Sequence, residues 1–76
     1  MRRKPRKLTL RQTLAVNVRR ERTRHQWSQR QLADFAEISQ TYVSQVEAAQ
    51  RAVSLDVVDK LAAAFEFEDS ARLLQR

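Results

Sequence analysis

Apolar residues recur along the chain at intervals of three or four, which is the spacing of one face of an α-helix. No segment shows the alternation of apolar and polar residues that is typical of a strand. The pattern therefore predicts an all-α fold with five helices, at about residues 10–24, 29–36, 40–48, 55–65 and 69–75. A chain of 76 residues has room for one such domain, which we place at residues 9–76.

The same spacing predicts which side chains face the core. In the first helix these are Leu10, Leu14 and Val18. The two central helices contribute Leu32, Ala33, Ala36, Ile38, Val43 and Val46. The fourth helix contributes Leu55, Val58, either Leu61 or Ala62, and Phe65. Because Ala33 and Ala36 are small, the two central helices can cross steeply with their backbones close together.

Hydroxyl residues mark where the helices begin. Thr9 with Gln12, and Ser28 with Gln31, match the capping box, in which the hydroxyl accepts a hydrogen bond from a free backbone N–H and the glutamine reaches back. Two further candidates for the N-cap position are Ser39 and Ser54.

Charge is distributed unevenly along the chain. Residues 1–30 contain 11 Lys and Arg against the single acid Glu21, whereas residues 31–76 contain four against eight acids. This division indicates a basic surface that meets phosphate and a more acidic body that faces away from it. Residues 1–8 are expected to form a flexible basic arm that lies in a minor groove or along the phosphate backbone. The other interpretation is that the arm only keeps a small protein soluble.

Composition argues against several classes of protein. The chain has no cysteine, so it can form neither a disulfide nor a thiolate metal site, and a cytoplasmic location is favoured. His25 is the only histidine, and a zinc site needs more ligands. No apolar run approaches the roughly 20 residues that cross a bilayer. We find no nucleophile with a base and no glycine-rich phosphate loop, so no enzymatic activity and no cofactor or metal are expected.

The segment from Ser28 to Glu47 contains two short helix patterns around one tight turn, and the second carries uncharged hydrogen-bonding side chains on its outer face. With its flanking helices, this segment resembles the lambda-repressor and Cro-like helix-turn-helix family, often called the Xre family, over residues 14–69. The resemblance implies a compact five-helix lambda-repressor-like bundle that binds double-stranded DNA. It also implies an internal ion pair between Arg22 and Glu47.

One departure from the family concerns glycine. The family usually has glycine at the positions of Gln26, Glu37, Ala49 and Glu66, and this chain has none. Several of these positions need a positive φ, which costs a non-glycine residue on the order of 1 kcal/mol. We expect the turn at Glu37 to persist with a strained or adjusted backbone, because the hydrophobic stripes on both sides fix the crossing of the helices.

Candidate DNA-contacting residues follow from the resemblance and from groove chemistry. The base-contacting candidates are Gln40, Thr41, Ser44 and Gln45. A glutamine offers a donor and an acceptor that match the N6 and N7 edge of adenine, and Gln40 is the first choice for that role. The phosphate-contacting candidates are Gln29, Arg30, Tyr42 and Arg51, with Arg2, Arg3 and Lys4 in the arm. For Tyr42 a second interpretation remains, in which its ring packs on the scaffold.

These features predict a sequence-specific transcriptional regulator, by default a repressor, that binds a near-palindromic operator as a homodimer. The dimer is expected to form through the fourth and fifth helices. Its apolar candidates are Val53, Val57, Phe67, Leu73 and Leu74, although Leu73 or Leu74 could instead close the core. The alternative function is that of an antitoxin-type interaction module, which neutralises a toxin and binds DNA secondarily. An exposed Phe35 would favour the alternative.

Overall fold

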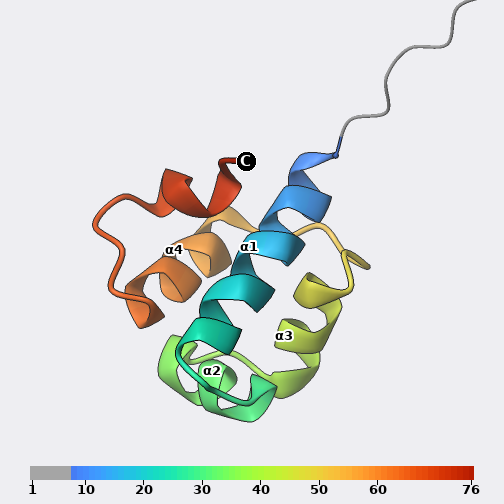
Figure 1. Cartoon of the computed structure of the whole chain (residues 1–76). Coiled ribbons are helices and arrows are strands. Elements are labelled where there is room, and N and C mark those ends of the chain that lie inside the picture. Colours follow the sequence, from blue (N-terminus) through green and yellow to red (C-terminus); the bar gives the residue numbers. More distant parts are fainter. Residues whose placement is uncertain (1–7) are drawn as a thin grey trace, which may run out of the picture.

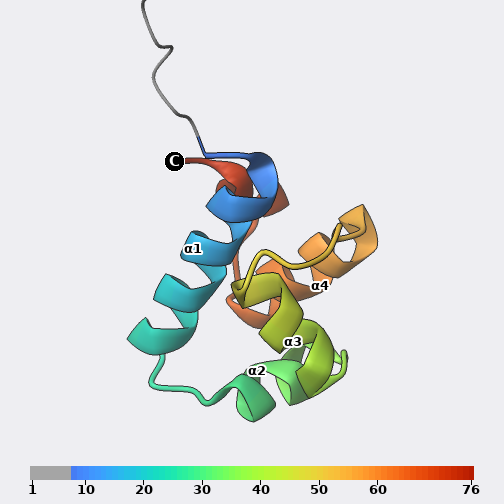
Figure 2. The ribbon, with the colours of Figure 1, turned by 90° about the vertical axis from the view of Figure 1, so that its right-hand side faces the viewer.

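The computed structural model describes residues 8–76, which fold into four α-helices and one short 3-10 helix. In chain order these are α1 (Leu10–Arg24), α2 (Gln29–Ala36), α3 (Gln40–Glu47), α4 (Leu55–Ala64) and the 3-10 helix η1 (Ser70–Leu74). Helix α1 contacts α3 on one flank and η1 on the other, while α2 packs against both α3 and α4 (Figures 1 and 2). No strand occurs in this range, so the all-α prediction is confirmed. Within it, no helix is long and apolar enough to span a membrane.

The helices begin where the sequence predicts. Thr9 and Ser28 form complete capping boxes with Gln12 and Gln31, and the hydroxyls of two further serines, Ser39 and Ser54, accept hydrogen bonds at the starts of α3 and α4. Helices α1 and α2 match their predicted bounds, whereas α3 and α4 each end one residue earlier than predicted. The capping side chains therefore fix the residue at which each of the four α-helices begins.

The prediction of a fifth α-helix over residues 69–75 is wrong. Residues 70–74 form the 3-10 helix η1, in which the Asp69 carboxylate accepts from the Ala71 N–H at its start. The segment has only five residues, and their hydrogen bonds do not offset the free-energy cost of nucleating an α-helix. Leu73 is fully buried, so η1 closes the core with one side chain.

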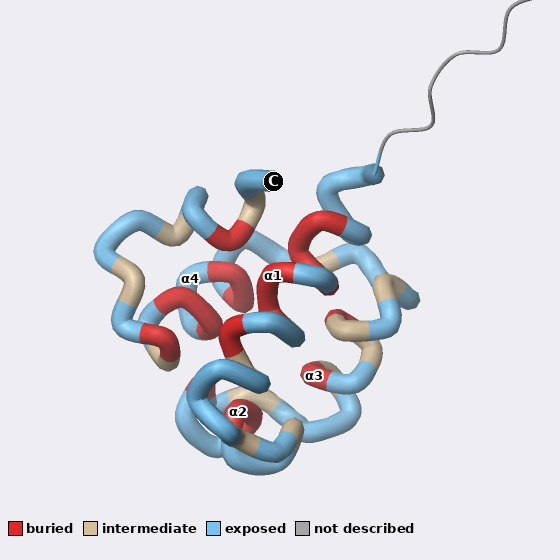
Figure 3. Tube along the Cα trace, viewed as in Figure 1, coloured by how far each residue is buried: buried red, intermediate tan, exposed pale blue. Residues whose placement is uncertain are grey.

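One hydrophobic core joins the four α-helices and η1, and buried positions face one another across the interior (Figure 3). Its members are Leu14, Val18, Leu32, Ala33, Ala36, Val43, Val46, Val57, Val58, Leu61, Ala62, Phe65 and Leu73. Of the other predicted core residues, Ile38 is half-buried against this cluster, and only Leu10 and Leu55 are largely exposed, at 66% and 76%. Each is the first residue of its helix, where no neighbouring element covers the side chain.

The residues predicted to form a dimer surface divide between the core and the surface. Val57 is buried in the core, so its assignment to an exposed interface is wrong, whereas buried Leu73 matches the alternative expectation that it closes the core. Val53, Phe67 and Leu74 are half-buried against it.

A left-handed residue follows each α-helix, at the four positions where the resemblance implied glycine. The φ angles are 58° at Gln26, 59° at Glu37, 56° at Ala49 and 61° at Glu66. After each of them the next backbone N–H bonds to a carbonyl five residues earlier, as Ile38 does to Ala33 at 3.0 Å. This is the pattern of the Schellman motif. The chain thus keeps the family's turns without glycine and accepts a backbone strain of about 1 kcal/mol at each one.

Candidate nucleic-acid interface

Helix α3 presents a polar outer face. Gln40, Thr41 and Ser44 are exposed, and Gln45 is partly exposed. Together with Gln29 of α2, these residues line one shallow hollow on the surface. The structure therefore brings together all four base-contacting candidates and one of the phosphate-contacting candidates.

The inner faces of α2 and α3 hold this surface in place. Ala33 and Ala36 are each only 2% exposed, and Val43 and Val46 are buried against the same core. The turn between the helices passes through the left-handed Glu37, and half-buried Ile38 packs against the core after it. Small residues on α2 and branched residues on α3 thus fix the angle at which α3 projects.

An ion pair ties α3 to α1. Arg22 Nε donates to Glu47 Oε2 at 2.6 Å, and Arg22 Nη2 donates to Glu47 Oε1 at 2.9 Å. Arg22 Nη1 also donates to the Trp27 carbonyl at 2.8 Å. The hydrogen bond to Glu47 raises the pKa of Arg22 above its ordinary value, although burial opposes this shift. The ion pair that the resemblance implied is therefore present, with two-pronged geometry that restrains rotation of α3.

Gln29 shares this network. Its Nε2 donates to Glu47 Oε1 at 3.2 Å, which orients the side chain at the start of α2. An amide nitrogen carries two hydrogens, so one N–H of Gln29 stays available for an acceptor outside the protein.

Arg51, in the loop after α3, forms a second cluster with side chains of that helix. Its Nη1 donates to Gln45 Oε1 at 2.9 Å, and its guanidinium lies 4.0 Å from the centre of the Tyr42 ring. Tyr42 is half-buried against the core. The Tyr42 ring thus supports the Arg51 guanidinium, which in turn holds the side-chain oxygen Oε1 of Gln45.

The remaining phosphate-contacting candidates are placed differently. Arg30 is exposed in the first turn of α2, whereas Arg2, Arg3 and Lys4 lie outside the described residues. Sequence reasoning did not select Arg19, which lines a second shallow hollow next to Gln29 and Ser44. A signal was available, because Arg19 precedes Arg22 by three residues and so lies on the face of α1 that meets α3.

Comparison with known proteins agrees with this geometry. A helix-turn-helix family model matches residues 18–69 of the chain. The chain belongs to the helix-turn-helix family, of the Xre and lambda-repressor type. No curated protein sequence matches it.

Solved structures of other helix-turn-helix proteins are similar over most of the chain. A hypothetical transcription factor, NHTF from Neisseria, is 35% identical with a TM-score of 0.85, and the match covers 99% of this chain and 85% of that one. The restriction-modification controller protein C.AhdI from Aeromonas hydrophila is also 35% identical, with a TM-score of 0.77 and coverage of 86% and 96%. The clp gene regulator ClgR from C. glutamicum is 25% identical, with a TM-score of 0.79 and coverage of 90% and 87%.

Proposed function

We propose that this protein is a sequence-specific DNA-binding transcriptional regulator that inserts α3 into the major groove. The observation that carries the proposal is the hollow formed by Gln29, Gln40, Thr41, Ser44 and Gln45, whose polar side-chain groups are all amides and hydroxyls. Such groups exchange hydrogen bonds with base edges, whose donor and acceptor pattern in the major groove identifies each base pair. The similarity to regulators of the helix-turn-helix family supports the same function.

The two glutamines of α3 are set up to read different chemistry. Gln40 forms no side-chain hydrogen bond within residues 8–76, so its amide can offer a donor and an acceptor to adenine. Gln45 already accepts from Arg51 through its Oε1, so its free N–H groups suit an acceptor, such as guanine O6 or thymine O4. Thr41 and Ser44 lie between them and add hydroxyl contacts.

Phosphate contacts would position α3 on the duplex. The start of α2 supplies Gln29 and Arg30, with the positive end of the helix dipole. Arg19 and Arg51 flank the base-reading hollow on either side, and Tyr42 supports Arg51. The arm residues Arg2, Arg3 and Lys4 extend the basic charge. These contacts supply affinity that depends on salt but not on sequence.

We further propose that the regulator is a cytoplasmic repressor that binds a near-palindromic operator as a homodimer. A single module of this size reads few base pairs, and a second copy doubles the sequence information. Leu10 and Leu55 are exposed and line an apolar groove that includes Val53 and Leu74, beside α4 and η1. This groove is the surface for the second copy. Sedimentation equilibrium of the whole protein distinguishes one copy from two.

The proposed role of Gln40 is tested with Gln40→Ala. On a duplex selected from random sequence, binding should weaken by about 1–3 kcal/mol because the bidentate pair with adenine is lost. Affinity for unrelated duplexes should stay the same, because phosphate contacts remain. Titration of both duplexes at one fixed salt concentration provides the measurement.

The matched control is Ser70→Ala, which removes a polar side chain at the start of η1, outside the hollow of α3. This variant should bind both duplexes as the original protein does. Equal losses on selected and unrelated DNA in Gln40→Ala would exclude Gln40 as a base-reading residue.

Phe35 supports a second candidate function. Phe35 is 57% exposed on α2, and the centre of its ring lies 4.6 Å from that of Trp27, with the two rings tilted by 41°. An exposed aromatic ring of this kind suits a protein partner, as in an antitoxin that neutralises a toxin. DNA binding that is weak for every selected duplex would favour this candidate over the regulator.

A further inference from the structure

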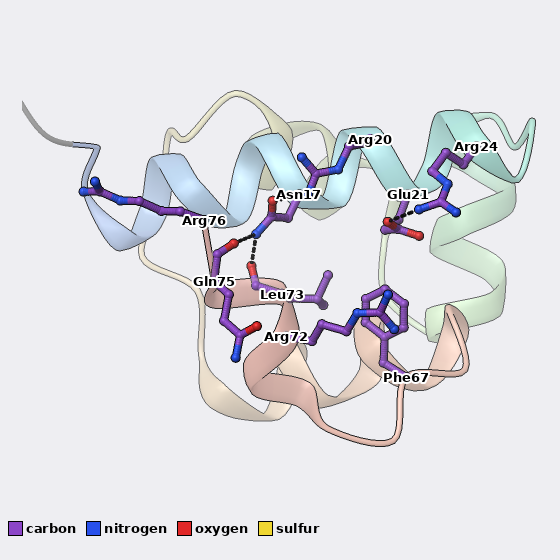
Figure 4. A pocket seen from close by; sticks show the side chains of 9 residues that line it. All are labelled: Asn17, Arg20, Glu21, Arg24, Phe67, Arg72, Leu73, Gln75 and Arg76. Atoms are coloured by element: carbon purple, nitrogen blue, oxygen red, sulfur yellow. Dashed lines mark hydrogen bonds and ion pairs between the residues drawn. The ribbon is translucent and has the colours of Figure 1, made fainter.

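A pocket of about 320 Å³ lies on the flank of α1 that faces away from α3, between α1 and η1 (Figure 4). The side chains that line it are those of Asn17, Arg20, Glu21, Arg24, Phe67, Arg72, Leu73, Gln75 and Arg76. Its volume is at the lower end of the range for small-molecule sites. The pocket is separate from the surface assigned to base reading, because α1 lies between that surface and η1 (Figure 1).

Three guanidinium groups surround this pocket, and each is held by a partner. Arg20 Nη2 donates to Asn17 Oδ1 at 2.7 Å, and Arg24 Nη1 donates to Glu21 Oε2 at 3.2 Å. The Arg72 guanidinium lies 4.3 Å from the centre of the Phe67 ring. A guanidinium has five N–H donors, so all three retain free donors after these contacts. Arg76 does not add to them, since its side chain turns away toward the Leu8 carbonyl.

The charge of the lining is unbalanced. Glu21 is the only carboxylate among the side chains that line the pocket, and it already pairs with Arg24. The partners of Arg20 and Arg72 are an amide and an aromatic ring, which hold the guanidinium groups without neutralising them. Positive charges that line one pocket repel one another, and a bound anion relieves that repulsion.

Asn17 makes the wall of the pocket rigid. It is buried on α1, and its Nδ2 donates to the Leu73 carbonyl at 2.8 Å and to the Gln75 carbonyl at 2.6 Å. With Arg20 on its Oδ1, every polar atom of this amide is engaged. Asn17 therefore holds the Arg20 guanidinium in place before a ligand arrives, which lowers the entropic cost of binding.

We propose that this pocket binds a phosphate group through Arg20, Arg24 and Arg72. The planar fork of a guanidinium matches the oxygens of a phosphate, and arginine recognises this group better than a point charge does. The phosphate can belong to a small phosphorylated molecule or to the backbone of nucleic acid outside the α3 surface. The assignment does not depend on the proposed function of α3.

The test is a titration of the whole protein with inorganic phosphate and with glycerol phosphate, followed by backbone amide NMR. Sodium chloride at equal ionic strength is the reference. Phosphate should shift amides near Asn17, Arg20 and residues 72–75. Arg72→Ala should weaken phosphate binding roughly tenfold, since a charge-assisted hydrogen bond is lost. The control Arg11→Ala removes the same charge from an exposed position of α1 outside the pocket and should leave the affinity unchanged.

Glu21→Gln gives a result that a purely structural role of these residues would not produce. Loss of the only lining carboxylate should tighten phosphate binding severalfold, even if the variant is less stable. Equal weakening by Arg72→Ala and Arg11→Ala, or equal shifts with chloride, would overturn the proposal, because either result means general attraction of anions to a basic protein.

A second arm of the experiment identifies the source of the phosphate. Glycerol phosphate binding with no effect of Arg72→Ala on duplex affinity assigns the pocket to a small phosphorylated molecule. Loss of duplex affinity in Arg72→Ala, together with a shallower dependence on salt, assigns it to nucleic acid. No shift with either phosphate compound and no change on DNA would reject the site.

Discussion

The two flanks of α1 are braced by polar side chains of opposite character. Toward α3, the brace is the charged pair of Arg22 and Glu47, and the surface beyond it presents neutral amides and hydroxyls. Toward η1, the brace is the neutral amide of Asn17, and the surface beyond it presents guanidinium groups. Both braces connect α1 to an element distant in the sequence.

This contrast shows how a small protein fixes two surfaces without altering their chemistry. A close ion pair has no net charge, so it adds little electric field to the neutral side chains of α3 that select bases. An amide carries no charge, so Asn17 leaves the positive charge of the α1 and η1 surface uncancelled. Each brace therefore positions its surface and leaves that surface free to bind.

The largest effect is expected on the charged flank, from Glu47→Gln. This change leaves the guanidinium of Arg22 largely buried beside a neutral partner, since only 16% of its side chain is exposed. The free energy of unfolding should fall by about 3 kcal/mol, because breaking a buried pair leaves one charge uncompensated. Urea denaturation at neutral pH measures the loss.

The control for this variant replaces both partners, as Arg22→Met with Glu47→Leu. Apolar residues of similar volume should recover most of the lost stability, since no charge is left buried. If the double variant is as unstable as Glu47→Gln, packing rather than an unpaired charge explains the loss, and the two flanks do not differ in the way described.

A smaller effect is expected on the neutral flank, from Asn17→Ala. The Leu73 and Gln75 carbonyls lose their donor, and the free energy of unfolding should fall by about 2 kcal/mol. Amide hydrogen exchange should quicken in residues 71–75 before it changes in α3. Val16→Ala is the control on the exposed face of α1 and should cost less than about 0.5 kcal/mol. Equal costs for the two variants would mean that Asn17 is not a brace.

Most of the fold could be predicted from the sequence, because its signals are local. A hydroxyl cap and its glutamine lie three residues apart, and an apolar stripe repeats within one helix. These signals gave the starts of all four α-helices, whereas the left-handed turns were implied by the resemblance to the family. They failed for Leu10 and Leu55, since periodicity gives the face of a residue but not whether a neighbouring element covers it. The same limit applies to residues 69–75, where too few residues follow the pattern.

The candidate site was predicted in part. Spacing along one helix was sufficient to group Gln40, Thr41, Ser44 and Gln45 on one face of α3. The partners that restrict the hydrogen bonding of Gln45 could not be predicted, because the link to Arg51 depends on the path of the loop. The pocket between α1 and η1 was not found for a similar reason. Arg72 lies about 50 residues after Arg20 and Arg24 in the sequence, and the tertiary fold brings it to the same pocket.

The smallest effect should be the same on both flanks, and it concerns the left-handed turns. Ala49 lies in the turn after α3, and Glu66 lies between α4 and η1. Both residues have a positive φ. Changing either residue to glycine should stabilise the protein by about 1 kcal/mol, since glycine adopts this conformation without steric strain. Thermal unfolding measures it, and a gain of that size raises the Tm of a small domain by about 4–8 °C.

Ala48→Gly is the matched control for Ala49→Gly, because it is the same substitution one residue earlier at a right-handed position. It should destabilise by roughly 0.5–1 kcal/mol through the greater freedom of glycine in the unfolded chain. Opposite signs at Ala48 and Ala49 would assign the gain to relief of backbone strain. Similar gains at Ala49 and Glu66 would then show that backbone strain is the same on both flanks of α1. The flanks would then differ only in their polar braces.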